Sequence, residues 1–496
     1  MQKLGMIDAS FLYSETDKVF NHIASVQQFE LPKNIESGEF IKGLKQYLVN
    51  RSHLVPYLTR VIKMMPGQID HPVWISDDNF DIDNHVIEIP LEAPGTFDQL
   101  QNKVAQLHSQ PMDRNIPLWS MKVITGLEDG TIYYYNQAHH ACLDGMAGQA
   151  ATMTLMDSSP DHKDFEVPAN FPESEKPSLV DLFQSSLTNL MDFQARTLDR
   201  NAGILDSMFK MTQRALDPAS TFGALGQVAP AVSFNKTIGQ ERTYACGKLA
   251  LADVKLIGKS LDASVNDVFL SLCSGALRSY LETRGELPTR DLIAGCPVST
   301  RKPNSKDMGN SVTMMAVDLA SSIADPRTRL LKIKSSADTG KAVTLDLAGG
   351  FEDNIALLGL PAMAKFTSLA TEAMGLANFS PLPINVVISN VPGPRESLYS
   401  NGAKMLSHFP VSIPVHGIGI NITVQSYAGE LFFGITACRE ALADAGQLRN
   451  FLLKAFKQFH ALVKPRSVTE ISIATKVVQS KDIAVGTELA PEKRVA

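Results

Sequence analysis

Residues 130–156 read GTIYYYNQAHHACLDGMAGQAATMTLM, and this stretch does most to decide the fold. Its first eight residues are rich in β-branched and aromatic side chains, a composition typical of a strand. The second half is rich in Ala and Met and has the composition of a helix. Between the two, His139 and His140 close the strand, and Asp144 and Gly145 follow in a tight turn. The stretch therefore predicts a strand, a turn and a helix that together present an imidazole at a cleft.

The residue types in this turn point to proton transfer. Histidine titrates near neutral pH, so a positioned imidazole of His139 or His140 can accept a proton at pH 7. Asp144 would stand where the helix begins, and there it can cap the free N–H groups or pair with a buried cation. Gly145 would permit a close backbone approach. The turn is therefore our candidate catalytic site.

Less specific interpretations compete with this one. The histidine pair can simply be buried and hydrogen-bonded, and a helix cap is the favoured role for Asp144. A metal held by His139, His140 and Asp144 is disfavoured, because metals need three or four convergent ligands and no further His/Cys cluster exists. We expect no metal. Cys142 could carry an acyl group, but we expect it to face the core as a small apolar residue.

Composition and charge narrow the class of protein. The 496 residues carry 46 Lys and Arg against 52 Asp and Glu, a net charge of −6, which lacks the basic excess of a nucleic-acid binder. The five cysteines form no C-x-x-C pair, which argues against a disulfide framework or a zinc ribbon. The N-terminus has no readable secretory signal. The uncharged stretches 373–394 and 405–429 hold too many Pro, Gly, Ser and Asn residues for spanning helices. We expect a soluble, cytosolic protein.

Strand-like and helix-like segments alternate in two parts of the chain. Helical spacing marks residues 41–50, 97–108 and 266–282, a buried strand is predicted at 384–389, and a hairpin at 418–436.

This alternation predicts an α/β architecture with two similar mixed-sheet halves. The predicted divisions are an N-terminal half at 1–165, a helical crossover linker at 166–236, a C-terminal half at 237–465 and a polar tail at 466–496.

The histidine motif resembles the HHxxxDG motif of the bacterial bifunctional wax ester synthase/acyl-CoA:diacylglycerol acyltransferases. HHxxxDG alone is moderately specific, because condensation domains share it, but further blocks resemble the family in the expected order. These are the opening LGMIDASFL from Leu4, the PLW block Pro117, Leu118 and Trp119, the ND block Asn266 and Asp267, CPVSTR ending at Arg301, ISNVPGP with Ser389 and Asn390, and NITVQSYAG from Asn421. The resemblance covers about residues 1–460.

The resemblance implies a chloramphenicol-acetyltransferase-like fold, in which two α/β halves meet at a cleft and the histidine is reached from both sides. It implies that His140 takes the proton from an alcohol, whose oxygen attacks the acyl-CoA thioester without an acyl-enzyme. His139 would orient the site. Asp144 would be structural, and we expect it to pair with Arg301.

The other family blocks receive supporting roles from the same resemblance. Gly145 and the PLW block would be structural, with Trp119 in the core of the first half. Asn266 and Asp267 would face the cleft at a helix start, and they would contact substrate together with Ser389 and Asn390.

The implied partners are acyl-CoA, which is a substrate rather than a cofactor, and a long-chain alcohol or diacylglycerol. Because these substrates are apolar, we expect a peripheral protein on the inner face of the membrane or on lipid inclusions, with no cofactor and no nucleic acid. Residues 179–216 or 342–376 could be an amphipathic contact, although packing on their own domain is favoured for each.

Three other functions compete with this one. They are a condensation-type acyltransferase with a carrier-bound donor, a glycerolipid acyltransferase with His-x4-Asp spacing, and a lipid-droplet protein without activity. The sequence leaves the acceptor, the acyl chain length and the oligomeric state open.

Overall fold

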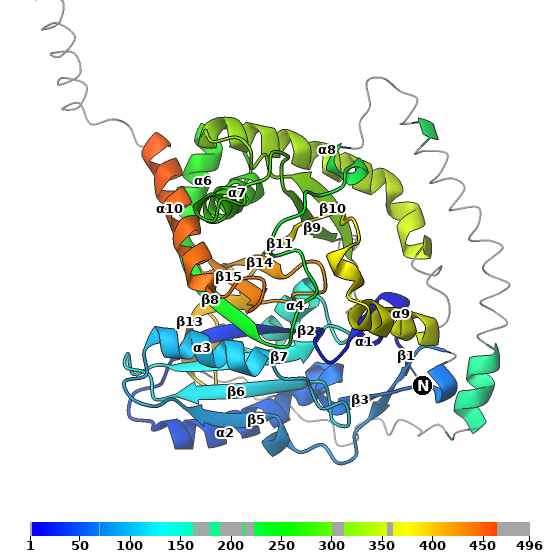
Figure 1. The fold of residues 1–496 in the computed structure, drawn as a ribbon. Coiled ribbons are helices and arrows are strands. Elements are labelled where there is room, and N and C mark those ends of the chain that lie inside the picture. The colour runs from blue at the N-terminus through cyan, green and yellow to red at the C-terminus, as the bar shows by residue number, and fades with distance from the viewer. Residues whose placement is uncertain are drawn as a thin grey trace, which may run out of the picture.

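A computed structural model describes residues 2–68, 70–161, 165, 178, 180–188, 212–213, 223–299, 312–354 and 361–463. Within these residues the chain forms two six-stranded sheets with helices packed against them, and a small three-stranded sheet of β1 (Gln2–Lys3), β4 (Val73–Ser76) and β3 (Arg60–Lys63). Figure 1 shows the two large sheets as separate layers of the molecule. The expected mixed α/β fold with two sheet-rich halves is confirmed.

The first sheet has the strand order β12-β13-β2-β7-β6-β5. At its centre β2 (His22–Glu30) pairs antiparallel with β7 (Ile132–His139), followed by β6 (Trp119–Thr125) and the parallel edge strand β5 (Val86–Pro90). Helices α2 (Ser37–Arg51) and α3 (Phe97–His108) bury their apolar sides in the same core as these strands. The histidine motif therefore follows a central strand, whose register is fixed on both sides.

The second sheet has the order β10-β9-β11-β14-β15-β8. Its strands are β8 (Arg242–Ala250), β9 (Ile293–Ser299), β10 (Val312–Asp318), β11 (Val386–Val391), β14 (Ile420–Tyr427) and β15 (Glu430–Cys438). The helices that accompany it are α6 (Leu251–Ser260), α7 (Val265–Thr283), α8 (Pro326–Asn354) and α10 (Ala445–Val463). Helix α7 is buried on nearly all sides because α6, α8 and α10 all pack on it. It forms the centre of the larger hydrophobic core.

The two halves are interlocked by strands that cross between them. Strands β12 (Tyr399–Ser400) and β13 (Ala403–Val411) lie late in the chain, yet β13 pairs antiparallel with β2, with Phe409 opposite Val26. In the other direction, Gln101 of α3 accepts a hydrogen bond from the backbone N–H of Cys246 in β8 at 3.0 Å. The two sheets therefore do not divide the chain at a single position, and the predicted divisions stay a prediction.

Several elements match their predictions closely. The helix expected at 97–108 is α3, which begins with a capping box between Thr96 and Gln99. The helix expected at 266–282 lies within α7, and the predicted hairpin is formed by β14 and β15. Among the residues that the structure describes, none of the helices is both long and apolar enough to cross a bilayer.

The predicted crossover linker is described only in part. Residues 180–188 are helical and a short 3-10 helix spans Gly223–Gly226. The rest of the linker up to residue 222, apart from 178 and 212–213, lies outside the described residues, and so does the predicted polar tail.

Candidate active site

The histidine motif forms the predicted strand, turn and helix. Strand β7 ends at His139, and helix α4 (Gly145–Leu155) begins directly after Asp144. Asp144 is buried, and its Oδ1 accepts a hydrogen bond from the backbone N–H of Ala147 at 2.7 Å. The favoured role of Asp144 as a helix cap is confirmed. Arg301, its suggested partner, lies outside the described residues.

Gly145 brings the motif against the second half of the molecule. A Cβ atom on Gly145 would lie 3.2 Å from Cγ2 of Val391, which ends β11 in the second sheet. That separation is tighter than ordinary van der Waals contact, so glycine permits the close approach of α4 to β11. The motif therefore lies at the interface between the two halves.

His140 is held by its backbone and by one aromatic neighbour. Its ring stacks on Phe11 of helix α1 (Met6–Ser14), with the ring centroids 4.1 Å apart and the planes at 16°. Its backbone N–H donates to the carbonyl oxygen of Asn21 at 2.7 Å. The residue is half-buried, so the imidazole combines a fixed position with partial accessibility.

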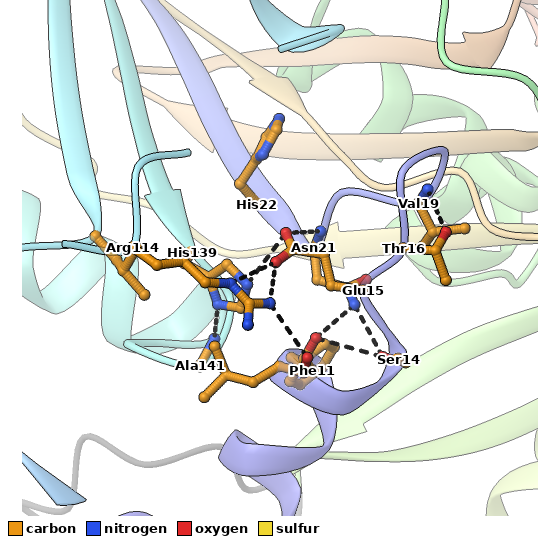
Figure 2. Close-up of polar contacts among 12 residues, drawn as sticks. Phe11, Ser14, Glu15, Thr16, Val19, Asn21, His22, Arg114, His139 and Ala141 are labelled. Atoms are coloured by element: carbon orange, nitrogen blue, oxygen red, sulfur yellow. Dashed lines mark hydrogen bonds and ion pairs between the residues drawn. The ribbon is translucent and has the colours of Figure 1, made fainter. Parts of the chain in front are cut away.

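His139 is fully buried, and a hydrogen bond at Nδ1 fixes the orientation of its ring. Nδ1 accepts a hydrogen bond from the backbone N–H of Ala141 at 3.0 Å, which places the ring hydrogen of the neutral form on Nε2. Nε2 lies 3.5 Å from Oε1 of Glu15 (Figure 2). The geometry suits an orienting role for His139 better than a role in contact with substrate.

Glu15 joins several parts of the site, although it belongs to none of the sequence motifs. Its carboxylate accepts hydrogen bonds from Arg114 Nε at 3.1 Å and from the backbone N–H of Asn21 at 3.3 Å (Figure 2). Burial by itself would raise the pKa of Glu15, but its interactions with His139 and Arg114 outweigh burial and lower the pKa to about 2. Glu15 is therefore a carboxylate at neutral pH.

Neither Glu15 nor Arg114 belongs to a local pattern that could have revealed the pair. Arg114 lies 99 residues after Glu15 in the sequence, and the two side chains meet only in the tertiary structure. The one available signal is that Glu15 closely follows the family-like opening block.

His22 lies beside His139 in the sheet but differs from it in its surroundings. The two residues are direct partners in the register of β2 and β7. Burial, followed by the neighbouring His139, lowers the pKa of His22 to about 3, and its Nε2 contacts the backbone oxygen of His108 at 3.2 Å. His22 is therefore neutral at physiological pH and serves as a core histidine.

Cys142 faces the core, as expected. It packs with Leu118 and Leu143, and its thiol donates weakly to the backbone oxygen of Leu118 at 4.0 Å. Burial, followed by the nearby charge of Asp8, raises the pKa of this thiol. The thiol is therefore protonated at neutral pH, a poor state for a nucleophile.

The PLW block supports the motif from the neighbouring strand. Trp119 is buried in the core, where it stacks on His85 with a centroid separation of 4.4 Å and donates from Nε1 to the Leu58 oxygen at 2.9 Å. The backbone oxygen of Leu118 accepts from the N–H of His139 at 3.0 Å. Pro117 lies with Trp119 at a cavity of about 460 Å³. The core position predicted for Trp119 is confirmed.

Of the remaining predicted residues, Asn390 and Asn266 meet next to Val391, the neighbour of Gly145. Asn390 Nδ2 donates to Asn266 Oδ1 at 3.3 Å, and Asn390 directly precedes Val391. Ser389 lies on β11 opposite Thr423 of β14.

Asp267 is buried in the capping box of α7, and its carboxylate accepts from both the backbone N–H and the hydroxyl of Ser264. The substrate-binding roles of this group stay predictions, and the cap gives Asp267 a structural task.

Within the described part of the chain, no three His, Cys, Asp or Glu side chains are grouped as metal ligands would be. The site consists of a half-buried imidazole at the interface of two mixed-sheet halves. This arrangement is that of the chloramphenicol-acetyltransferase-like acyltransferases. Solved structures with the same fold include the first condensation domain of the CDA synthetase, with a TM-score of 0.56 and 11% identity over 93% of this chain and 96% of that one.

Family models and relatives define the family within this class. The wax ester synthase/diacylglycerol acyltransferase catalytic domain matches residues 4–269, and the C-terminal domain of the same family matches 308–460. The chain is 31% identical to the O-acyltransferase WSD of Acinetobacter baylyi, over 93% of this chain and 98% of that protein. It is 30% identical to a probable diacylglycerol O-acyltransferase of Mycobacterium tuberculosis, over 92% and 98%.

A solved wax ester synthase/diacylglycerol acyltransferase from Marinobacter aquaeolei has the same fold, with a TM-score of 0.68 and 23% identity over 94% of this chain and 100% of that one. The chain belongs to the wax ester synthase/diacylglycerol acyltransferase family. It is an acyltransferase.

Proposed function

We propose that this protein transfers a fatty acyl group from acyl-CoA to the hydroxyl of a long-chain alcohol or of diacylglycerol, with His140 as the general base. The observation that carries the proposal is the setting of His140. Its ring is half-buried against Phe11, and its motif lies at the interface of the two halves. The names of the relatives support the two acceptor classes.

In the proposed reaction, His140 removes the proton from the acceptor hydroxyl as its oxygen attacks the thioester carbonyl. The carbon–sulfur bond then breaks, and CoA leaves with the proton returned by His140. The ester forms without a covalent acyl-enzyme, because the only thiol in the motif is buried and protonated. The reaction as written balances without a metal or a redox cofactor.

The test is an assay of the purified protein with palmitoyl-CoA and either hexadecanol or dioleoylglycerol. Released CoA and the ester product are measured together, so that thioester hydrolysis is separated from transfer. We expect ester formation by the wild-type protein and a loss of about 10²- to 10⁴-fold in His140→Ala, the range for positioned proton transfer. An unchanged rate in His140→Ala would contradict the mechanism, and bound lipid without ester would favour the binding-protein alternative.

We propose further that helix α9 (Pro361–Ala373) meets the lipid surface from which the apolar substrates come. Met363, Phe366 and Leu369 are 60%, 72% and 46% exposed and follow one another at helical spacing. Helix α9 packs on α1 (Figure 1), and α1 carries the Phe11 that supports His140. An exposed apolar face beside the site suits contact with a bilayer.

Flotation with phosphatidylcholine vesicles tests the role of α9. We expect Phe366→Glu to lower the fraction of protein bound, because a charge replaces apolar area at the contact. Leu256→Glu is the matched control, since Leu256 is 45% exposed on α6 and outside the proposed face. Equal vesicle binding by Phe366→Glu and the control would remove α9 from the contact.

A further inference from the structure

We infer that Glu15 is a positioning residue, which fixes the peptide groups on both sides of His140 and so holds its imidazole in place. The inference rests on the proposed function, because it assigns Glu15 a role through the base His140. It adds a residue that lies outside the histidine motif. General bases are commonly oriented by a third group, and Glu15 would supply that function here through the backbone.

The first connection runs through Asn21, on the N-terminal side of His140. Oε1 of Glu15 accepts the backbone N–H of Asn21 at 3.3 Å, and the carbonyl oxygen of Asn21 accepts the backbone N–H of His140 at 2.7 Å. Asn21 also donates from Nδ2 to the Phe11 oxygen at 2.7 Å. The peptide group that precedes His140 is thus tied to the carboxylate and to α1.

The second connection runs through His139 to the C-terminal side. The same Oε1 atom lies 3.5 Å from Nε2 of His139, and Nδ1 of that ring accepts the backbone N–H of Ala141 at 3.0 Å (Figure 2). The carboxylate therefore favours the ring orientation that keeps Nδ1 on the peptide group after His140. Oε1 of Glu15 therefore takes part in both connections to His140, one through Asn21 and one through His139.

Glu15 is itself held by cations from two further segments. Arg114 donates to its Oε2, and Lys365 of α9 donates to its backbone oxygen. The lowered pKa of Glu15 keeps it charged throughout the working range of the enzyme. Helix α1 thus supplies the ring of Phe11 under His140, and the carboxylate of Glu15 follows directly after its last residue.

The experiment compares Glu15→Gln, Glu15→Asp and the control Glu39→Gln in the ester-forming assay, with kcat and KM determined separately and folding checked by thermal melting. Glu39 lies exposed in the first turn of α2. We expect kcat to fall by about 10- to 100-fold in Glu15→Gln, because small displacements of a reacting group are costly, while KM changes less than about twofold. Glu39→Gln should match the wild type.

Glu15→Asp separates positioning from structural support. It keeps the charge beside Arg114 and so should melt like the wild type, but its shorter side chain draws the oxygen away from Asn21 and His139. We expect kcat to fall in this variant as well. A wild-type kcat in a folded Glu15→Asp or Glu15→Gln protein overturns the inference.

A double-mutant cycle with His139→Asn tests whether Glu15 acts through His139. Asparagine can keep an acceptor near Ala141 but loses the nitrogen that faces Glu15. If Glu15 acts partly through His139, the loss in Glu15→Gln/His139→Asn should be smaller than the product of the two separate losses. Independent, multiplicative losses would overturn this connection. A wild-type protein that forms no ester would overturn the proposed function as well, whereas an active wild type with unaffected Glu15 variants overturns only the inference.

Discussion

Two ionisable residues close to His140 differ in charge at neutral pH because their surroundings differ. Cys142 is buried among apolar side chains, and its raised pKa keeps the thiol neutral. Glu15 is also buried, but the partners His139 and Arg114 more than offset the effect of burial and lower its pKa. The difference follows from the partners and not from the depth of burial. The same site thus holds an inert thiol and a permanent carboxylate.

The Glu15 carboxylate should make stability depend on pH. Its pKa falls from 4.5 in the unfolded chain to about 2 in the folded protein, so its contribution is complete above about pH 4.5 and is lost as the pH falls toward 2. A shift of this size corresponds to roughly 3 kcal/mol. Denaturant unfolding should show that Glu15→Gln is less stable than the wild type at pH 7, by a margin that narrows at pH 3. A constant margin would contradict the assignment.

Asp144 should contribute to stability as a helix cap. Asp144→Ala leaves the N–H of Ala147 without its acceptor and should lower the free energy of unfolding by about 0.5–2 kcal/mol. Asp144→Asn retains a capping oxygen and should recover most of the loss. The measurement is denaturant unfolding with the activity assay in parallel. Lost activity with full stability in Asp144→Ala would make this residue a catalytic partner instead.

At the scale of elements, the contact of α4 with β11 joins the histidine motif to the second sheet. Gly145 meets Val391 across this contact, and Asn390 beside it reaches Asn266 at the start of α7. Three sequence blocks that are far apart in the chain therefore converge where a helix start approaches a strand end. The contact depends on residue 145 being glycine, so its packing can be tested by introducing a side chain there.

Gly145→Val should force α4 away from β11. The new Cβ alone would lie 3.2 Å from Val391 Cγ2, and overpacking of this kind typically costs about 1–3 kcal/mol. We expect a lower melting temperature and lower activity. Val391→Ala removes the opposing methyl groups, so Gly145→Val/Val391→Ala should recover part of both. No recovery in the double variant would show that the contact with Val391 is not the limiting one.

At the scale of the whole molecule, the exchange of strands makes the two halves one cooperative structure. Strand β13 completes the first sheet although it follows most of the second in the chain, and α3 of the first half packs against β8 of the second. If acyl-CoA and alcohol enter such an interface from its two sides, they can meet directly at His140. This arrangement favours a direct reaction between the two bound substrates.

The kinetics should therefore be those of a ternary complex. We expect intersecting double-reciprocal plots for acyl-CoA and alcohol, no burst of CoA without acceptor, and substantial activity in Cys142→Ala. Burial of the thiol and its raised pKa are the physical reasons. Parallel plots together with an acyl group found on Cys142 by mass spectrometry would establish the covalent route instead.

Much of this protein could be predicted from local sequence. The period of apolar residues located α3 and α7, and the composition of residues 130–156 located β7, the turn and α4. These signals are local, because a helix or strand is encoded by neighbours within one or two turns. The ordered motifs then identified the family, and the position of Asp144 predicted its cap.

Only the tertiary structure decided which distant segments meet. The contact of Glu15 with Arg114 and His139, the pairing of β13 with β2, and the approach of Gly145 to Val391 leave no period or composition in the chain. Each depends on how two already formed surfaces pack, which is set by the summed fit of many side chains and not by any one segment. The sequence by itself determined the elements, the histidine motif and the family. Long-range packing determined what holds the histidine in place.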